Sequence, residues 1–389
     1  MRILSTGIIW TIFWGTWPAL VAGQSLRTPR IERVIPSPRQ PHAADRATIW
    51  YDDFDGPPKQ YGEATGPLDD SQSLSDGGKS LRCFYRKGSQ GTGGRKVFFG
   101  DAPVYSESAP RRGESFDEIY WRIYVKHQAG WRGAPAKMSR ATILADSHWA
   151  QAMIAHVWSG PGDSLTLDPV RGVDGRRVVT RRYNDFERMK WLGNRPASRF
   201  PIHATEESGW WVSVECRAKL NTPGKRDGVN QLWIDGRLEC ERRGLDWRGS
   251  YTERGINAVF LEAYWNRGSP VTQSRWYDNL VISTRPIGPV VCPANPVLVL
   301  ACRDGEHSGG GWEFEVSGDL HGRDVVFRSN RVSGNRAVVD PAHGKFIGPL
   351  AGRHGLAANQ VYYVRARYVE RTGSRSAWSR WHQGFRVAP

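Results

Sequence analysis

Hydrophobic and polar residues alternate along many short segments of this chain, which is the pattern of β-strands. The clearest case is residues 116–126, F-D-E-I-Y-W-R-I-Y-V-K. Because successive side chains of a strand point to opposite faces, this segment has one apolar and one polar face. The apolar face carries Ile119, Trp121, Ile123 and Val125, and the polar face carries Tyr120, Arg122, Tyr124 and Lys126.

The same reading predicts strands at residues 47–54, 79–87, 138–145, 149–158, 210–220, 228–234, 256–265 and 276–283. Asp235-Gly236 follows L-W-I and predicts a tight hairpin turn. Neither βαβ alternation nor a helical period is present. The pattern therefore predicts an all-β sandwich over residues 47–288.

A second series of strands is predicted beyond the Pro-rich boundary at residues 285–289, at 297–302, 312–316, 325–328, 361–368 and 384–387. Leu356 precedes Tyr362 at the spacing of the tyrosine corner of immunoglobulin-like sandwiches. With Trp312 and the W-S-R-W segment at 378–381, residues 289–389 resemble a fibronectin type III module, which implies a small immunoglobulin-like sandwich with a spacer or accessory role.

The N-terminal residues have the features of a targeting segment. Met1 and Arg2 precede an apolar stretch that ends in small residues, which predicts a secretory signal peptide over 1–23. The alternative is an uncleaved N-terminal membrane anchor. Residues 24–46, rich in Pro and Arg, are expected to form an exposed linker. Export implies a secreted, periplasmic or extracellular protein.

Charge and cysteine content narrow the function classes. There are 54 Lys and Arg against 39 Asp and Glu, so the formal charge is +15 and an acidic partner is expected. For an exported protein an acidic polysaccharide fits better than nucleic acid. Two cysteine pairings are open: Cys216 with Cys240, and Cys292 with Cys302; Cys83 is the fifth cysteine. C-x-x-C, H-E-x-x-H and calcium-loop motifs are absent, so neither a metal nor another cofactor is expected.

Four segments together point to a known family: W-R-G-A-P-A-K-M-S-R-A-T (131–142), W-A-Q-A-M-I-A-H-V-W (149–158), L-W-I-D-G (232–236), and the A-Y-W…R-W-Y-D-N-L-V-I-S-T stretch (263–284). They resemble the jelly-roll polysaccharide lyases of the concanavalin A-like group, nearest to the alginate and glucuronan lyases. The resemblance covers about residues 47–284. Non-catalytic laminin-G-like modules share part of these signals.

The resemblance implies β-elimination on a uronate-containing glycan, which needs a neutralised carboxylate, a base and an acid. It implies that Lys137 and Tyr264 reach one groove; Arg140 and His156 are the further catalytic candidates. The same residues have plainer interpretations. Lys137 and Arg140 can be a solvated charge pair, His156 a buried core histidine, and Tyr264 an aromatic residue at the sandwich rim.

A ladder of Tyr, Arg and Lys also suits an acidic sugar chain, because Arg pairs with carboxylates through two parallel hydrogen bonds. Tyr120, Arg122, Tyr124, Lys126 and Arg217 are therefore candidate substrate-binding residues, or else a solvated convex face. A polysaccharide lyase is the leading hypothesis. A non-catalytic carbohydrate-binding or adhesion protein is the alternative. A glycoside hydrolase is less well supported, because the E-x-D-x-x-E strand is absent.

Overall fold

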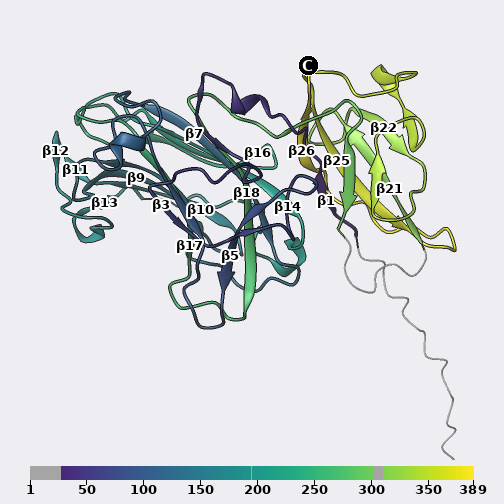
Figure 1. Cartoon of the computed structure of the whole chain (residues 1–389), viewed down its shortest axis with the longest axis horizontal. Coiled ribbons are helices and arrows are strands. Elements are labelled where there is room, and N and C mark those ends of the chain that lie inside the picture. Colours follow the sequence, from purple (N-terminus) through teal and green to yellow (C-terminus); the bar gives the residue numbers. More distant parts are fainter. Residues whose placement is uncertain (1–27, 194, 302–309) are drawn as a thin grey trace, which may run out of the picture.

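The computed structural model describes residues 28–193, 195–301 and 310–389, and its regular elements are β-strands apart from a few short 3₁₀ turns. The strands form two sandwiches, a larger one followed by a smaller C-terminal one (Figure 1). Short 3₁₀ turns occur at Pro41–Ala43, Ser106–Ser108, Phe186–Arg188, Thr205–Glu207 and Gly348–Leu350.

One sheet of the larger sandwich has seven strands, in the order β13 (Lys190–Trp191), β10 (Leu165–Arg171), β9 (Gln151–Ser159), β8 (Lys137–Leu144), β17 (Ala258–Tyr264), β6 (Gly94–Phe98) and β3 (Glu63–Thr65). Its facing sheet has the order β16 (Arg237–Leu245), β15 (Gly228–Ile234), β14 (Trp211–Lys219), β7 (Glu118–His127), β18 (Gln273–Ser283), β5 (Ser80–Tyr85) and β4 (Leu68–Asp69), with β2 (Thr48–Asp52) also pairing β18. β11 (Val173–Asp174) and β12 (Arg177–Val178) form a separate hairpin.

The C-terminal sandwich contains a six-stranded sheet, β19 (Val291–Cys292), β26 (His382–Val387), β25 (Val361–Val369), β21 (Gly311–Ser317), β22 (Val325–Ser329) and β24 (Gly344–Phe346). Opposite it lies a three-stranded sheet, β1 (Ile31–Val34), β20 (Val297–Leu300) and β23 (Arg336–Val338). The Tyr362 hydroxyl accepts a hydrogen bond from the Ala357 backbone N–H at 3.1 Å.

The period-two pattern of the sequence explains the core of the larger sandwich. The apolar face of β7 packs into a cluster with alternate residues of the facing sheet, among them Met153, Ala155 and Val157 of β9 and Val259 and Leu261 of β17. The Asp235-Gly236 hairpin turn between β15 and β16 is confirmed, and both residues have positive φ, 47° and 77°.

The expected exposed linker at 24–46 is wrong for its described part. β1 pairs antiparallel with β20, and Ile31 and Val34 are fully buried in the C-terminal sandwich. Gln40 is buried as well, and its amide exchanges two hydrogen bonds with the Val291 backbone. A four-residue strand is too short for its alternation to be recognised, and its partner lies far along the chain.

The pairing of Cys216 with Cys240 is also wrong. The two thiols lie on β14 and β16, with β15 between them, and both are buried and free. Cys83 and Cys292 are free in the described part of the chain. Cys302, the other partner considered for Cys292, lies outside it, as does the predicted signal peptide.

Candidate functional site

The four predicted catalytic residues lie on adjacent strands of the seven-stranded sheet. Lys137 and Arg140 are on β8, His156 is on β9, and Tyr264 ends β17. β8 runs between the other two strands, so that Lys137 is directly opposite Tyr264 and Arg140 is directly opposite His156. Their neighbours in sequence fill the core, which places these side chains on the outer face of the sheet.

Lys137 and Tyr264 form the accessible part of this cluster. The Lys137 Nζ lies 4.5 Å from the centroid of the Tyr264 ring, and both residues are partly exposed. The Tyr264 hydroxyl accepts a hydrogen bond from Gln90 Nε2 at 3.2 Å. Partial burial lowers the pKa of Lys137, against the opposing effect of Glu262, while Arg140 and Lys96 lower it further. A lysine in this setting loses its proton more readily than a free one and is suited to proton transfer.

Arg140 is already paired. Its fully buried guanidinium binds both carboxylate oxygens of Glu262, at 2.9 and 2.6 Å, and donates to the Asn184 side-chain oxygen at 2.7 Å. Burial alone would lower the pKa of Arg140, but Glu262 and Tyr183 together outweigh it and the pKa is raised. Because each guanidinium nitrogen already donates to one of these partners and the group is buried, Arg140 fixes Glu262 and the loop carrying Asn184 and does not offer a free cation to a substrate.

His156 is closed off from solvent. Its Nδ1 lies 3.0 Å from the Asp168 carbonyl oxygen, which fixes the proton on that nitrogen. Trp158 and Trp191 cover the ring, at centroid distances of 4.0 and 6.0 Å. Burial lowers the pKa of His156 far below its ordinary value, so the ring is neutral at pH 7. The prediction that His156 acts directly on a substrate is therefore contradicted by its burial.

A bulge holds the end of β17. The pairing with β8 shifts register between Leu261 and Tyr264. Beneath it, Arg275 donates to the Glu262 carbonyl oxygen at 2.7 Å, and the Tyr277 hydroxyl donates to the same oxygen at 3.1 Å. These two buried donors fix the backbone from which Glu262 and Tyr264 project.

Several residues at this face were not predicted from the sequence. Lys96 of β6 lies 4.8 Å from the Trp149 ring centroid and forms an ion pair with Glu63. Gln90 and Asn184, described above, belong to loops. The Glu262 position on the face of Tyr264 is visible from period two, but single residues in loops have no pattern that marks them.

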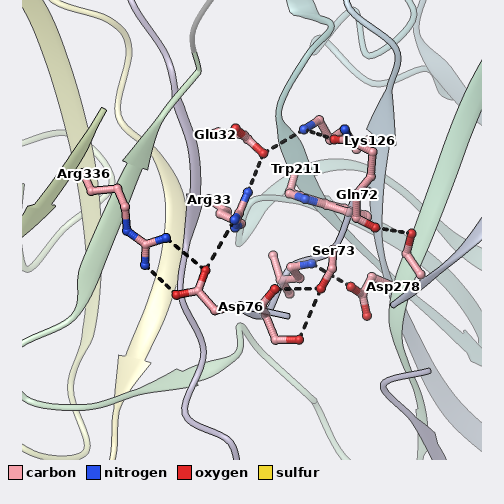
Figure 2. A network of polar contacts seen from close by, with 12 residues as sticks. Glu32, Arg33, Gln72, Ser73, Asp76, Lys126, Trp211, Asp278 and Arg336 are labelled. Atoms are coloured by element: carbon pink, nitrogen blue, oxygen red, sulfur yellow. Dashed lines mark hydrogen bonds and ion pairs between the residues drawn. The ribbon is translucent and has the colours of Figure 1, made fainter. Parts of the chain in front are cut away.

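The predicted substrate-binding stripe of β7 lies on the opposite sheet. Arg122 is fully buried and donates to the Gly288 carbonyl oxygen at 2.7 Å, and the Tyr124 hydroxyl accepts from the Val290 N–H at 3.0 Å. Lys126 Nζ contacts Glu32 at 2.7 Å and Gln72 at 2.6 Å (Figure 2).

The remaining two residues of the predicted set are no closer to the site. Tyr120 is 7% exposed and its hydroxyl donates to Glu118. Arg217, on neighbouring β14, pairs with the same Glu118 at 2.7 Å. The four β7 residues are therefore covered structural residues, and their assignment to substrate binding is wrong. The chain that follows the boundary packs on this polar face, which local alternation cannot reveal.

The described residues contain no group of three or more His, Cys, Asp and Glu side chains placed to hold a metal ion. In the same part of the chain, no helix is long and apolar enough to cross a membrane.

Comparison with known proteins gives only distant likenesses. No protein-family model matches the sequence, and no curated protein matches it. Among solved structures, alginate lyase Aly36B is 17% identical, with a TM-score of 0.37 over 67% of this chain and 98% of that one. An endo-β-1,4-glucuronan lyase from Trichoderma reesei is 15% identical, with a TM-score of 0.40 over 61% and 96%. The alginate lyase from Aplysia kurodai is 15% identical, with a TM-score of 0.41 over 61% and 99%.

Proposed function

We propose that this protein is a polysaccharide lyase that cleaves an acidic, uronate-containing glycan by β-elimination, with Lys137 and Tyr264 as the reacting groups. The observation that carries the proposal is their contact, with the Lys137 Nζ 4.5 Å from the Tyr264 ring centroid at a partly exposed position. The two side chains come from paired strands, so their spacing is set by the sheet and not by mobile loops.

The chemistry assigns each group one step. The neutral amine of Lys137 takes the proton beside the uronate carboxylate, and the electron pair of that C–H bond becomes the new C=C bond. The bond to the 4-linked oxygen breaks, and the Tyr264 hydroxyl supplies the proton that this oxygen needs. In this proposal the Gln90 amide, which donates to the Tyr264 hydroxyl, holds that hydroxyl in position.

A non-catalytic carbohydrate-binding protein is the second candidate, favoured by one specific observation. Two of the four predicted catalytic side chains are unavailable: Arg140 is buried and paired with Glu262 and Asn184, and His156 is fully buried. A glycosidase role for Glu262 has less support, because this carboxylate is held by Arg140 at both oxygens.

We further propose export through the N-terminal signal peptide and an accessory role for the C-terminal sandwich as a fibronectin type III-like module. The apolar stretch at 3–22 supports export. The Tyr362 hydrogen bond to the Ala357 backbone supports the module.

The direct test incubates the purified protein with a panel of polyuronates and glycosaminoglycans and follows the ultraviolet absorbance of unsaturated uronate. We expect a signal on at least one polyuronate, abolished in the Lys137→Ala variant. Binding without any absorbance change on the whole panel would contradict the lyase and support the carbohydrate-binding candidate.

A further inference from the structure

A second feature of the larger sandwich is a cavity at the edge of the seven-stranded sheet. It has a volume of about 640 Å³ and is bounded by the end of β10, the β11–β12 hairpin, strand β13 and the loop between β12 and β13. The β11–β12 hairpin and β13 lie at the end of the larger sandwich remote from the C-terminal sandwich (Figure 1).

The lining of this cavity is strongly basic. It includes Arg171, Arg177, Arg181, Arg188 and Lys190, with Asp174 as its one acidic residue. Arg171 pairs with Asp246 and Arg188 with Asp185. The other three, Arg177, Arg181 and Lys190, are exposed and have no ion-pair partner within the part of the chain that the structure describes. Unpaired cations gathered in a concave surface raise the local concentration of anions.

The cavity borders the sheet that carries Lys137 and Tyr264. Lys190 is the strand partner of Arg171 at the edge of this sheet. The next residue, Trp191, stacks on His156 of the outer face, so Lys190 and Arg171, which is opposite the core residue Met153, point to the other face of the sheet, and a chain that reaches both sites passes around the sheet edge. Arg171 is opposite Met153 of β9, whereas Lys137 is opposite Trp158 of the same strand. Five residues along a strand and two strand spacings separate Arg171 from Lys137, which is roughly 20 Å by strand geometry.

We propose that this basic cavity is a second, non-catalytic binding site for a polyanionic polysaccharide. A chain that occupies both the cavity and the Lys137–Tyr264 face gains affinity from the two contacts, whereas a disaccharide is too short to span them. The choice of ligand rests on the proposed function; the site itself rests on the cavity and its cations.

The chemistry of the lining favours a sugar polyanion over nucleic acid. Arg guanidinium groups bind carboxylates through paired hydrogen bonds, as they also bind phosphates, so the distinction rests on the other lining residues. Single-stranded nucleic acids also need aromatic side chains on which bases stack, and the lining residues of the cavity include no aromatic residue.

The test measures binding to surface-immobilised alginate polymer, to an alginate disaccharide and to a DNA duplex, in a Lys137→Ala background that prevents cleavage. The double variant Arg177→Gln/Lys190→Gln is compared with Lys345→Gln/Arg353→Gln. The latter removes the same charge from exposed positions of the C-terminal sandwich. We expect the first double variant to lose about tenfold in affinity for the polymer at low salt, because two exposed charge contacts together are worth about that factor. The matched variant should lose less than about twofold, because isolated exposed charges away from the binding site contribute little.

Three outcomes would overturn the proposal. Equal loss in both double variants would show general charge attraction, and equal loss for the disaccharide would show that binding does not require one chain to span the cavity and the Lys137–Tyr264 face. A larger loss on the DNA duplex than on alginate would assign the cavity to nucleic acid. Binding does not depend on turnover, so a protein without lyase activity that shows the expected loss would contradict the proposed function and leave this site standing.

Discussion

At the scale of the residue, accessibility separates the candidates that share one face of the sheet. Lys137 and Tyr264 are partly exposed, Arg140 is neutralised by Glu262, and His156 is sealed under Trp158 and Trp191. All four side chains are correct in type for elimination chemistry. Two of them have contacts that a substrate would have to break, at the cost of exposing a buried charge or moving two tryptophans.

The first prediction concerns Lys137→Ala and Tyr264→Phe. A positioned acid or base is worth roughly 10²- to 10⁴-fold in rate, so each change should lower kcat by at least about 100-fold. Tyr264→Phe keeps the ring and removes only the hydroxyl. Melting temperatures should stay within a few degrees of the parent, since both residues are partly exposed. Normal turnover with a lowered melting temperature would make either residue a structural one.

The second prediction concerns pH. Burial lowers the pKa of Lys137 below its ordinary value of 10.5. The amine must be neutral to take a proton, so kcat/KM should rise with pH and level off above this lowered pKa. The rising limb is measured under kcat/KM conditions between pH 5 and 10. Lys137→Arg keeps a positive charge, but the guanidinium does not lose its proton in this pH range. This variant should therefore be inactive across the range. Retained activity in Lys137→Arg would show that only the charge is needed.

At the scale of the element, short strands join distant parts of the chain. β1 has four residues, yet it completes the three-stranded sheet of the C-terminal sandwich through its pairing with β20. Its buried side chains, Ile31 and Val34, pack into the cluster that includes Trp312 and Phe314. The C-terminal sandwich therefore contains strands that precede the larger sandwich in the sequence as well as strands that follow it. Its three-stranded sheet is incomplete without β1.

The third prediction is that Ile31→Ala destabilises the protein by about 2–5 kcal/mol, the usual cost of truncating a fully buried isoleucine. Chemical denaturation, followed by the fluorescence of the tryptophans, measures this change. Arg39→Ala, an exposed position in the same segment, serves as the control and should change stability by no more than about 0.5 kcal/mol. An equally small effect of Ile31→Ala would mean that β1 is dispensable.

At the scale of the whole molecule, the C-terminal sandwich docks on the polar face of the sheet that contains β7 and β14. Trp211 of β14 and Tyr124 of β7 belong to the same buried cluster as Phe385 of β26. The contact is also polar: Asp76 accepts hydrogen bonds from Arg33 and Arg336, which come from β1 and β23 (Figure 2). The two sandwiches therefore meet through a shared buried cluster with ion pairs beside it.

The fourth prediction uses Asp235, at the hairpin turn beside this interface. Burial raises its pKa to about 6, although the Ser213 N–H and other donors oppose the shift. The folded protein therefore favours the neutral acid. The contribution of protonated Asp235 to the free energy of unfolding is complete below the unfolded pKa of about 4. It is lost as the pH rises through about 6, a change of roughly 3 kcal/mol.

Asp235→Asn removes this titration and keeps a residue type that tolerates positive φ. The difference in melting temperature between the Asp235→Asn variant and the parent should move in favour of the variant as the pH is raised from 4.5 to 7.5. A constant difference across this range would show that Asp235 does not titrate with folding.

Local alternation was enough to predict much of the fold and part of the site. The strand at 228–234 coincides with β15, and the predicted 116–126 strand overlaps β7 at 118–127. Strands with polar or Gly-containing sequences were missed, among them β6 (G-R-K-V-F) and β10, which contains Pro169. These strands are stabilised by the neighbouring strands with which they pair, and the sequence of one strand does not show which neighbours it will have.

What the sequence alone determined is which side chains share a face, because the period of a strand is fixed by its own backbone. It grouped Ile119 with Trp121 and Ile123, and Tyr120 with Arg122 and Tyr124. Only the tertiary structure decided what each face meets. The polar face of β7 reads as an exposed ladder, but Gly288, Val290 and β1 cover it, and its charges are satisfied by partners distant in sequence. The outer face of β8 and β17 reads the same way and remains partly open at Lys137 and Tyr264. Polarity is a property of the residue, whereas exposure depends on segments that arrive from elsewhere in the chain.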